Sequence, residues 1–156
     1  MPRHSLILAL ALGVAASSPA VSGSHDGNPA VKARNAHMQL YGFNLGTLGA
    51  MAKGEVEYDA DAASAAAANL AALATFNQSA YWVPGTSSDD LPGESRALPA
   101  IWEEGSTAGQ IGASFAEATA ALAAVAGDGK DAMAGAMGAV GKGCSDCHKA
   151  YRAPRN

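Results

Sequence analysis

The two cysteines of the sequence lie three positions apart, at Cys144 and Cys147, and His148 follows the second one directly. This spacing is the attachment sequence of c-type haem, in which each thiol adds across a haem vinyl group to form a thioether. The adjoining histidine is then held close enough to ligate the haem iron through an imidazole nitrogen. The motif therefore predicts one covalently bound haem c, with His148 as an iron ligand.

Two other uses of a cysteine pair fit its surroundings less well. A thioredoxin-type dithiol would follow a strand at the start of a helix, whereas this pair lies near the C-terminal end of an expected helix. A structural zinc site needs four ligands, and His25 and His37 lie far from the pair without a matching spacing. Haem attachment is therefore the better interpretation.

Length and composition fit one globular domain that needs additional bulk in its interior. The 156 residues are 49% hydrophobic and 15% charged, yet only 3 are Phe, 4 are Tyr and 2 are Trp, whereas 18 are glycine. A buried haem would supply the missing bulk. The formal net charge of −4 and the lack of a basic cluster argue against nucleic acid or an anionic membrane as a partner.

Residues 1–23 have the pattern of a secretory signal peptide. Arg3 and His4 precede an apolar run over 6–16, and small residues follow up to position 23. The run is well short of the roughly 20 apolar residues that span a bilayer, which argues against a retained membrane anchor. We therefore expect cleavage of 1–23, export to a periplasm, and one domain over 24–156.

Four segments carry helix signals and none carries a strand signal, which predicts an all-α, antiparallel four-helix bundle with covalently bound haem c. Asn28 before Pro29 is typical of a helix start, Gly54 is typical of a helix end, and Asp59 can cap the next segment. The expected helices cover 29–53, 60 to about 78, the stretch from a cap at Ser106 to about 126, and 130 to a point before Pro154.

Apolar side chains recur on one face of each expected helix and should meet in the interior. In the first helix, Val31, Met38, Leu45 and Ala52 recur every seven residues, with Tyr41 and Leu48 between them. The other faces comprise Leu70, Leu73 and Phe76; Ile111, Phe115, Leu122 and Val125; and Met133, Met137, Val140 and Tyr151. The cysteine pair and the histidine share the last face, because residues three and four apart lie on one side of a helix.

The stretch 83–99 is rich in proline, glycine, serine and aspartate, which predicts a long loop. Connections longer than about 12 residues without regular structure are uncommon and often functional. We expect this loop to cover part of the interior; a solvated linker is the alternative.

The arrangement as a whole resembles the class II c-type cytochromes, the cytochrome c′ family, which are exported haem four-helix bundles with CxxCH near the C-terminus. The stretch 144–152 resembles the closing signature of the family, and Arg34 with Asn35 resembles its haem-contacting Arg-Gln pair. The segments 84–86 and 101–102 resemble its connection between the second and third helices. The resemblance covers essentially the whole chain after 1–23.

The resemblance implies a role for each matching residue. Cys144 and Cys147 would form the thioethers, and His148 would be the proximal iron ligand. Arg34 and Asn35 would contact the haem edge and propionates, with Asn35 one methylene shorter than the usual glutamine. Glu94 matches an acidic residue on the propionate side, and it completes the set of cofactor-binding residues that the family pattern implies.

Met38 stands at the position that resembles the distal haem face of the family, and two functions depend on it. As a sixth ligand, its thioether would complete the His/Met pair that raises haem potential, and the protein would carry single electrons between redox partner proteins. As a side chain that only lines the distal face, it would leave a five-coordinate iron that binds nitric oxide or carbon monoxide. His37 is a poorer ligand candidate because it points about 100° away around the helix.

Enzymatic activity of the peroxidase type ranks last among the functions considered. Peroxide cleavage needs distal acid or base groups, and the stripe of Val31, Met38 and Leu45 offers none. We therefore expect that the protein is not an enzyme.

Three glycines of the first helix, Gly42, Gly46 and Gly49, recur at three and four residue steps and allow a close helix crossing. Between two subunits, this crossing would form the homodimer that the resemblance implies. Within one subunit, it would be ordinary bundle packing.

Overall fold

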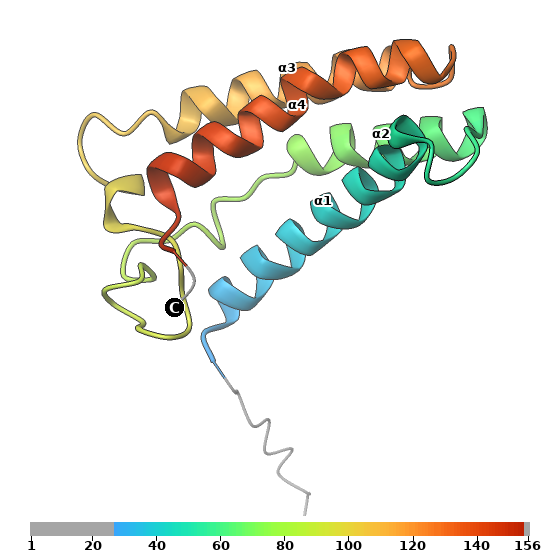
Figure 1. Ribbon diagram of the computed structural model, residues 1–156. Helices are drawn as coiled ribbons and strands as arrows, with labels where there is room; N and C mark the ends of the chain where they lie inside the picture. Colours follow the sequence, from blue (N-terminus) through green and yellow to red (C-terminus); the bar gives the residue numbers. More distant parts are fainter. Residues whose placement is uncertain (1–26, 155–156) are drawn as a thin grey trace, which may run out of the picture.

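The computed structural model describes residues 27–154, and the expected signal peptide at 1–23 lies outside them. The described residues form four α-helices and one short 3-10 helix, with no strand beyond an isolated bridge between Ala97 and Arg152. The helices are α1 (Pro29–Lys53), α2 (Ala60–Ala74), α3 (Ala108–Val125) and α4 (Lys130–Tyr151), and the 3-10 helix η1 covers Pro99–Ile101. The predicted all-α four-helix bundle is confirmed (Figure 1).

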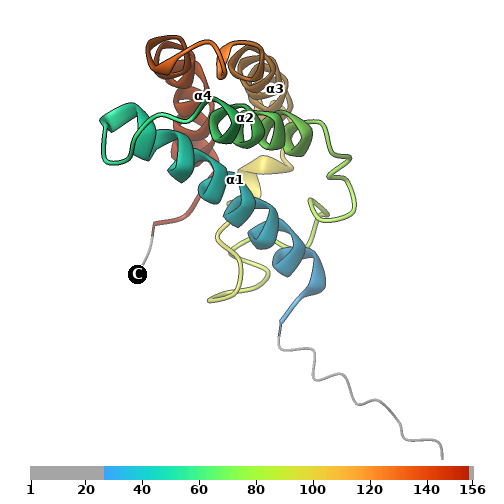
Figure 2. The ribbon, with the colours of Figure 1, turned by 90° about the vertical axis from the view of Figure 1, so that its right-hand side faces the viewer.

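The helices pack as two neighbouring pairs. Helices α3 and α4 lie side by side above α1 and α2 in both views (Figures 1 and 2). Contacts join α1 to α2, α2 to α3, α3 to α4, and α4 back to α1. None of the helices in the described part of the chain is long and apolar enough to cross a membrane.

The bounds of α1 agree with the capping residues in the sequence. The Asn28 side chain accepts hydrogen bonds from the N–H groups of Ala30 (2.9 Å) and Val31 (3.3 Å), which have no partner inside the helix. At the other end, Gly54 takes a left-handed conformation with φ of 74°, which glycine adopts without steric cost.

Helix α2 begins as predicted but ends four residues early. Asp59 caps it by accepting from the N–H of Ala62 at 2.8 Å. At its end, the Thr75 hydroxyl donates to the carbonyl of Ala72 at 2.9 Å, and such local side-chain bonds compete with helix continuation. Phe76 therefore lies beyond the helix and is 57% exposed, although its ring still contacts that of the buried His37, with centroids 5.9 Å apart.

The start of α3 is tied to the end of α4. The helix begins at Ala108, one residue later than expected, and the Ser106 hydroxyl accepts a hydrogen bond from the N–H of Ala108 at 3.3 Å. The Tyr151 hydroxyl accepts a hydrogen bond from the N–H of Thr107 at 2.7 Å and lies 3.0 Å from its hydroxyl. This contact lets a side chain from α4 satisfy the exposed start of α3.

The packed core occupies the end of the bundle where α1 turns into α2 and α3 turns into α4. Its largest fully buried apolar side chains come from all four helices. They are Leu48, Leu70, Leu122, Met133 and Val140. Alanines of α2, including Ala63 and Ala67, fill the space between them and allow the helices to approach closely.

The buried face of α1 differs from the predicted apolar stripe. Leu45 and Ala52 are only partly buried, and Met38 is 36% exposed. A strict seven-residue repeat drifts around a straight helix, and three polar side chains occupy the inner face instead. The buried residues of α1 are Val31, Arg34, His37, Tyr41, Asn44, Leu48 and Met51.

The glycines of α1 do not mediate a close crossing within the subunit. A Cβ atom added at Gly42, Gly46 or Gly49 would meet no described atom within 4 Å. The alternative of ordinary packing within one subunit therefore has no support at these glycines, and this face of α1 is open.

Candidate haem-binding site

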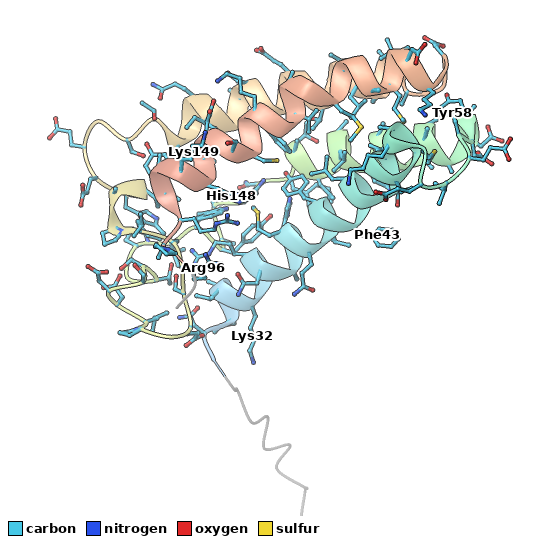
Figure 3. The ribbon with its side chains drawn as sticks, in the orientation of Figure 1. Lys32, Phe43, Tyr58, Arg96, His148 and Lys149 are labelled. Atoms are coloured by element: carbon cyan, nitrogen blue, oxygen red, sulfur yellow. The ribbon has the colours of Figure 1, made fainter. Side chains whose placement is uncertain are left out.

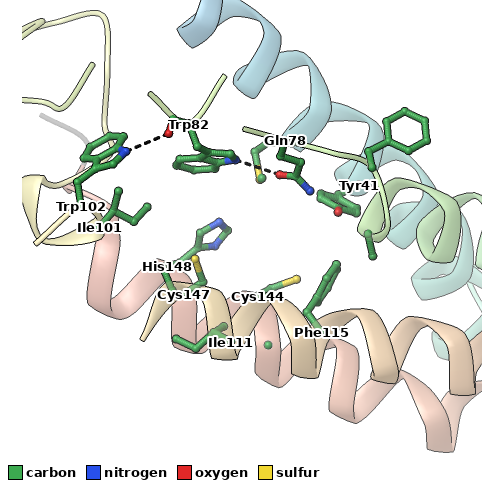
Figure 4. A pocket seen from close by; sticks show the side chains of 16 residues that line it. Tyr41, Gln78, Trp82, Ile101, Trp102, Ile111, Phe115, Cys144, Cys147 and His148 are labelled. Carbon is green, nitrogen blue, oxygen red and sulfur yellow. Dashed lines mark hydrogen bonds between the residues drawn. The ribbon is translucent and has the colours of Figure 1, made fainter. Parts of the chain in front are cut away.

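The attachment motif forms one wall of a half-open cavity between the helices. Cys144, Cys147 and His148 are half-buried on α4 and line the same cavity, whose volume is about 440 Å³. Figure 3 shows His148 directed from α4 toward the interior, and Figure 4 shows it beside the cysteines. The helical geometry thus brings together three groups that the sequence places three and four residues apart.

The other walls of the cavity are mainly apolar and aromatic. Met38 and Tyr41 come from α1, Ile111 and Phe115 come from α3, and Trp82 belongs to the segment after α2. Cavities of about 300–1000 Å³ with apolar walls are typical of small-molecule and cofactor sites. This cavity therefore has the size and lining that a buried macrocycle needs.

Both thiols are held in their neutral form. Burial raises the pKa of Cys144 and of Cys147; the neighbouring Cys147 raises that of Cys144 further, and Arg152 partly opposes the rise at Cys147. A thioredoxin-type pair depends instead on a lowered thiol pKa. The electrostatics of this pair therefore argue against dithiol redox chemistry.

His148 is held as a neutral imidazole. Burial lowers its pKa most, and the positive charges of Arg152 and Arg96 lower it further. The neutral ring has a lone pair available for a metal, so its electrostatic environment favours the ligating form.

The donor set and the shape of the cavity fit haem c. Two thiols at CxxC spacing, a neutral imidazole next to them and a facing apolar cavity satisfy the requirements for thioether attachment and axial ligation. Gly143 contributes to this fit, because a Cβ there would lie 3.0 Å from the Phe115 ring. A side chain at this position would displace Phe115 from the cavity wall.

Arg34 lies behind the cavity wall. It is buried, and its guanidinium donates to the Thr86 carbonyl and the Ser95 hydroxyl, both at 3.0 Å. The same group lies over the rings of Trp82 and Trp102, at 4.7 and 5.9 Å from their centroids. The tryptophans line the cavity, whereas Arg34 is not among the lining residues.

The structure does not bring Asn35 and Glu94 to the cavity. Asn35 is exposed because it lies one position, about 100°, around α1 from the buried Arg34. A Glu94 carboxylate oxygen accepts a hydrogen bond from the N–H of Asn28 at the start of α1. The haem contacts that the resemblance implies for these two residues therefore have no support in their positions.

The polar residue Gln78 lines the cavity and was missed by the sequence reasoning. Its side-chain oxygen accepts a hydrogen bond from Trp82 Nε1 at 3.0 Å, and Trp102 Nε1 donates to the Trp82 carbonyl at 3.1 Å (Figure 4). The amide of Gln78 also contacts the Tyr41 hydroxyl, whose pKa burial raises to about 12. Because Gln78 lies beyond α2, no helical periodicity indicated which way it points.

His37 is buried on α1 but does not line the cavity. Its Nδ1 lies 2.8 Å from the Tyr81 hydroxyl, and its ring lies 4.7 Å from that of Tyr41. Its Nε2 is buried without a hydrogen-bond partner among the described residues. This position agrees with the expectation that His37 is a poorer iron ligand than Met38.

A four-helix bundle whose last helix presents CxxCH to an interior cavity defines a class II haem c protein. The family model described as cytochrome c′ matches residues 29–152. The chain belongs to the cytochrome c′ family, and its cofactor is covalently bound haem c.

Curated relatives and solved structures agree with this assignment. A cytochrome c′ of Cereibacter sphaeroides is 41% identical over 140 residues, which are 90% of this chain and 93% of the relative. A cytochrome c-554 of the same species is 39% identical over 122 residues, 78% of this chain and 91% of the relative. A solved cytochrome c′ from Rhodobacter spheriodes has a TM-score of 0.77 at 42% identity and covers 81% of this chain and 96% of its own.

The descriptions of two further solved cytochromes c′ refer to a ligand. One shows ligand-controlled dimer dissociation, with a TM-score of 0.73 at 32% identity. The other is an Alcaligenes xylosoxidans variant with bound carbon monoxide, with a TM-score of 0.69 at 30% identity. Each covers 80% of this chain, and 95% and 94% of its own chain respectively.

Proposed function

We propose that this protein is an exported single-electron carrier whose haem iron is ligated by His148 and Met38. One observation carries the proposal: the two side chains line the same cavity from different helices, His148 from α4 and Met38 from α1. A His/Met ligand pair is typical of electron-transfer cytochromes and raises the haem potential.

The bound haem supplies an iron that takes up and releases one electron. The residues of the chain bind the cofactor and shield it. Cys144 and Cys147 would hold the cofactor through thioethers, and the neutral His148 would supply a nitrogen ligand to the iron. The apolar and aromatic walls would limit the access of water to the bound cofactor, and less polar surroundings favour its less charged, reduced state. The Met38 thioether, on a flexible side chain that lines the cavity, would supply a second ligand to the iron.

Carbon monoxide binding tests this ligand assignment. The reduced wild-type protein should bind carbon monoxide weakly, whereas Met38→Ala should become high-spin and bind it readily. Met137→Ala is the matched control, because Met137 packs against the core and does not line the cavity. Rapid carbon monoxide binding by the wild type, unchanged by Met38→Ala, would contradict the proposal.

A second candidate function, the binding of nitric oxide or carbon monoxide by a five-coordinate iron, is favoured by the polar groups near Met38. The Tyr41 hydroxyl and the Gln78 amide line the cavity on the side away from α4 (Figure 4). Either group can donate a hydrogen bond to a diatomic ligand. In this case, Tyr41→Phe in the wild-type background should raise the C–O stretching frequency of the carbon monoxide complex.

We also propose that the open face of α1 forms a homodimer. Leu40 and Phe43 are 51% and 73% exposed, and Phe43 points away from the bundle (Figure 3). Gly42 and Gly46 beside them leave room for a second helix. Phe43→Glu should halve the mass measured by analytical ultracentrifugation, whereas Val56→Glu, at an exposed apolar residue outside α1, should not.

The proposed location is the periplasm, and the proposed partners are other redox proteins. Support comes from the signal-peptide pattern at 1–23 and the covalent haem of the family. N-terminal sequencing of the protein from a periplasmic fraction should find a start near residue 24. A start at Met1 in the cytoplasmic fraction would contradict export.

A further inference from the structure

Arg34 is a buried cation without an acidic partner among the described residues. Its side chain is 3% exposed, and no Asp or Glu of 27–154 forms an ion pair with it. Burying an unpaired charge is costly unless hydrogen bonds replace the lost water. Hydrogen bonds to Thr86 and Ser95 therefore replace part of the hydration that Arg34 loses on burial.

The planar, forked guanidinium donates hydrogen bonds to three residues of the segment between α2 and η1. Nη1 donates to the Tyr81 carbonyl at 3.4 Å and to the Thr86 hydroxyl at 3.2 Å. Nη2 donates to the Thr86 carbonyl and to the Ser95 hydroxyl, both at 3.0 Å. One side chain thus ties residues 81, 86 and 95 to the first helix.

The same group also supports the aromatic wall of the cavity. Arg34 lies 4.7 Å from the centroid of Trp82 and 5.9 Å from that of Trp102, both of which line the cavity. A guanidinium within about 6 Å of an aromatic face is attracted to it, most strongly when both are desolvated. The hydrogen bonds and the stacking therefore act on the same segment.

We propose that Arg34 is a positioning residue that holds the segment 81–102 closed over the cavity, and that it acts through its planar fork. This role is additional to the haem contact that the resemblance implies, because it rests on hydrogen bonds between Arg34 and the segment itself. Lysine cannot replace it, since an ammonium has no planar fork to bind separated acceptors or to stack flat on a ring. The proposal does not depend on whether Met38 ligates iron.

Limited proteolysis and tryptophan fluorescence of the holoprotein test the proposal. Arg34→Lys and Arg34→Met should both be cleaved by thermolysin before Leu91 about tenfold faster than the wild type, because local opening exposes the segment. Tryptophan emission, which nearby haem quenches, should rise in both variants. Lys32→Met, at an exposed position of the same helix, should match the wild type in both measurements.

The Arg34→Lys variant distinguishes the effect of the planar guanidinium from the effect of its positive charge. If Arg34→Lys behaves as the wild type and only Arg34→Met opens, the positive charge is sufficient and the proposal is wrong. Unchanged cleavage and emission in both variants would also overturn it. If these variants do not fold, the double variant Thr86→Val with Ser95→Ala removes two acceptors of Arg34 and leaves the arginine in place. This double variant should open the segment while it retains the circular dichroism of the helices. Cleavage at the wild-type rate would overturn the proposal.

Discussion

At the end of the bundle where α1 turns into α2, apolar side chains from four helices fill the interior, whereas at the other end the helices surround a cavity of about 440 Å³. The first end packs through leucines, methionines and small alanines. The second end relies on the polar contacts of Arg34 and on a segment without long helices. The difference indicates that the cavity end needs haem to complete it, while the packed end does not.

Loss of the attachment cysteines should have the largest effect. Cys144→Ser with Cys147→Ser should abolish covalent haem and destabilise the cavity end, since the stabilisation given by a tightly held cofactor is about 4 kcal/mol or more. Mass spectrometry and thermal unfolding measure the two effects. The control Ser145→Ala, between the same cysteines, should retain haem. A double cysteine variant as stable as the wild type would contradict the conclusion that the cavity end needs haem.

Truncation of a buried side chain should have the second-largest effect, and that effect should differ between the two ends of the bundle. Leu122→Ala at the packed end should lower the free energy of unfolding by about 2–5 kcal/mol, because it leaves a cavity among fully buried side chains. Ile111→Ala at the edge of the haem cavity should cost about 1 kcal/mol, since this side chain is only half-buried. Denaturant unfolding measures both values. Equal losses of the free energy of unfolding would contradict the distinction between the packed end and the cavity end.

Alkaline pH should act on the cavity end through Tyr41. Burial raises the pKa of Tyr41 to about 12, whereas an unfolded tyrosine titrates near 10. The neutral hydroxyl therefore contributes stability that is fully present below about pH 10 and is lost as the pH rises toward 12. Tyr41→Phe should reduce the fall in melting temperature between pH 9 and 11; an unchanged fall would argue against this role.

The smallest effect should come from the exposed ion pair within the attachment motif. Asp146 pairs with Lys142 one turn earlier on α4, and the two side chains are 40% and 76% exposed. Asp146→Asn should change the free energy of unfolding by less than about 0.5 kcal/mol. Covalent haem measured by mass spectrometry should be unchanged. A large loss of either quantity would assign this position a structural role that its exposure does not suggest.

Local chemistry made much of the fold predictable. The bounds of α1 follow from Asn28 and Gly54, and the start of α4 follows from the glycines before Lys130, because capping and helix breaking act over a few residues. The wall of the site on α4 was predictable for the same reason, since Cys144 and His148 lie four positions apart on one helix.

Long-range polar contacts were the part that the sequence could not predict. The buried Arg34 donates a hydrogen bond to Ser95, which lies 61 positions away in the sequence. The buried Asn44 accepts a hydrogen bond at 3.0 Å from Asn69 of α2. Periodicity cannot identify such partners, so the predicted stripe placed Met38 further inside than it lies. Gln78 was missed because it follows the end of α2, where no repeat fixes its direction.

The absorption spectrum of the oxidised holoprotein at neutral pH tests the proposed His148 and Met38 ligation most directly. Ligation by Met38 predicts a low-spin spectrum with a weak sulfur-to-iron charge-transfer band, which disappears in Met38→Ala. A high-spin spectrum in the wild type would contradict it, and would leave Met38 as a side chain that lines the cavity beside an open coordination site.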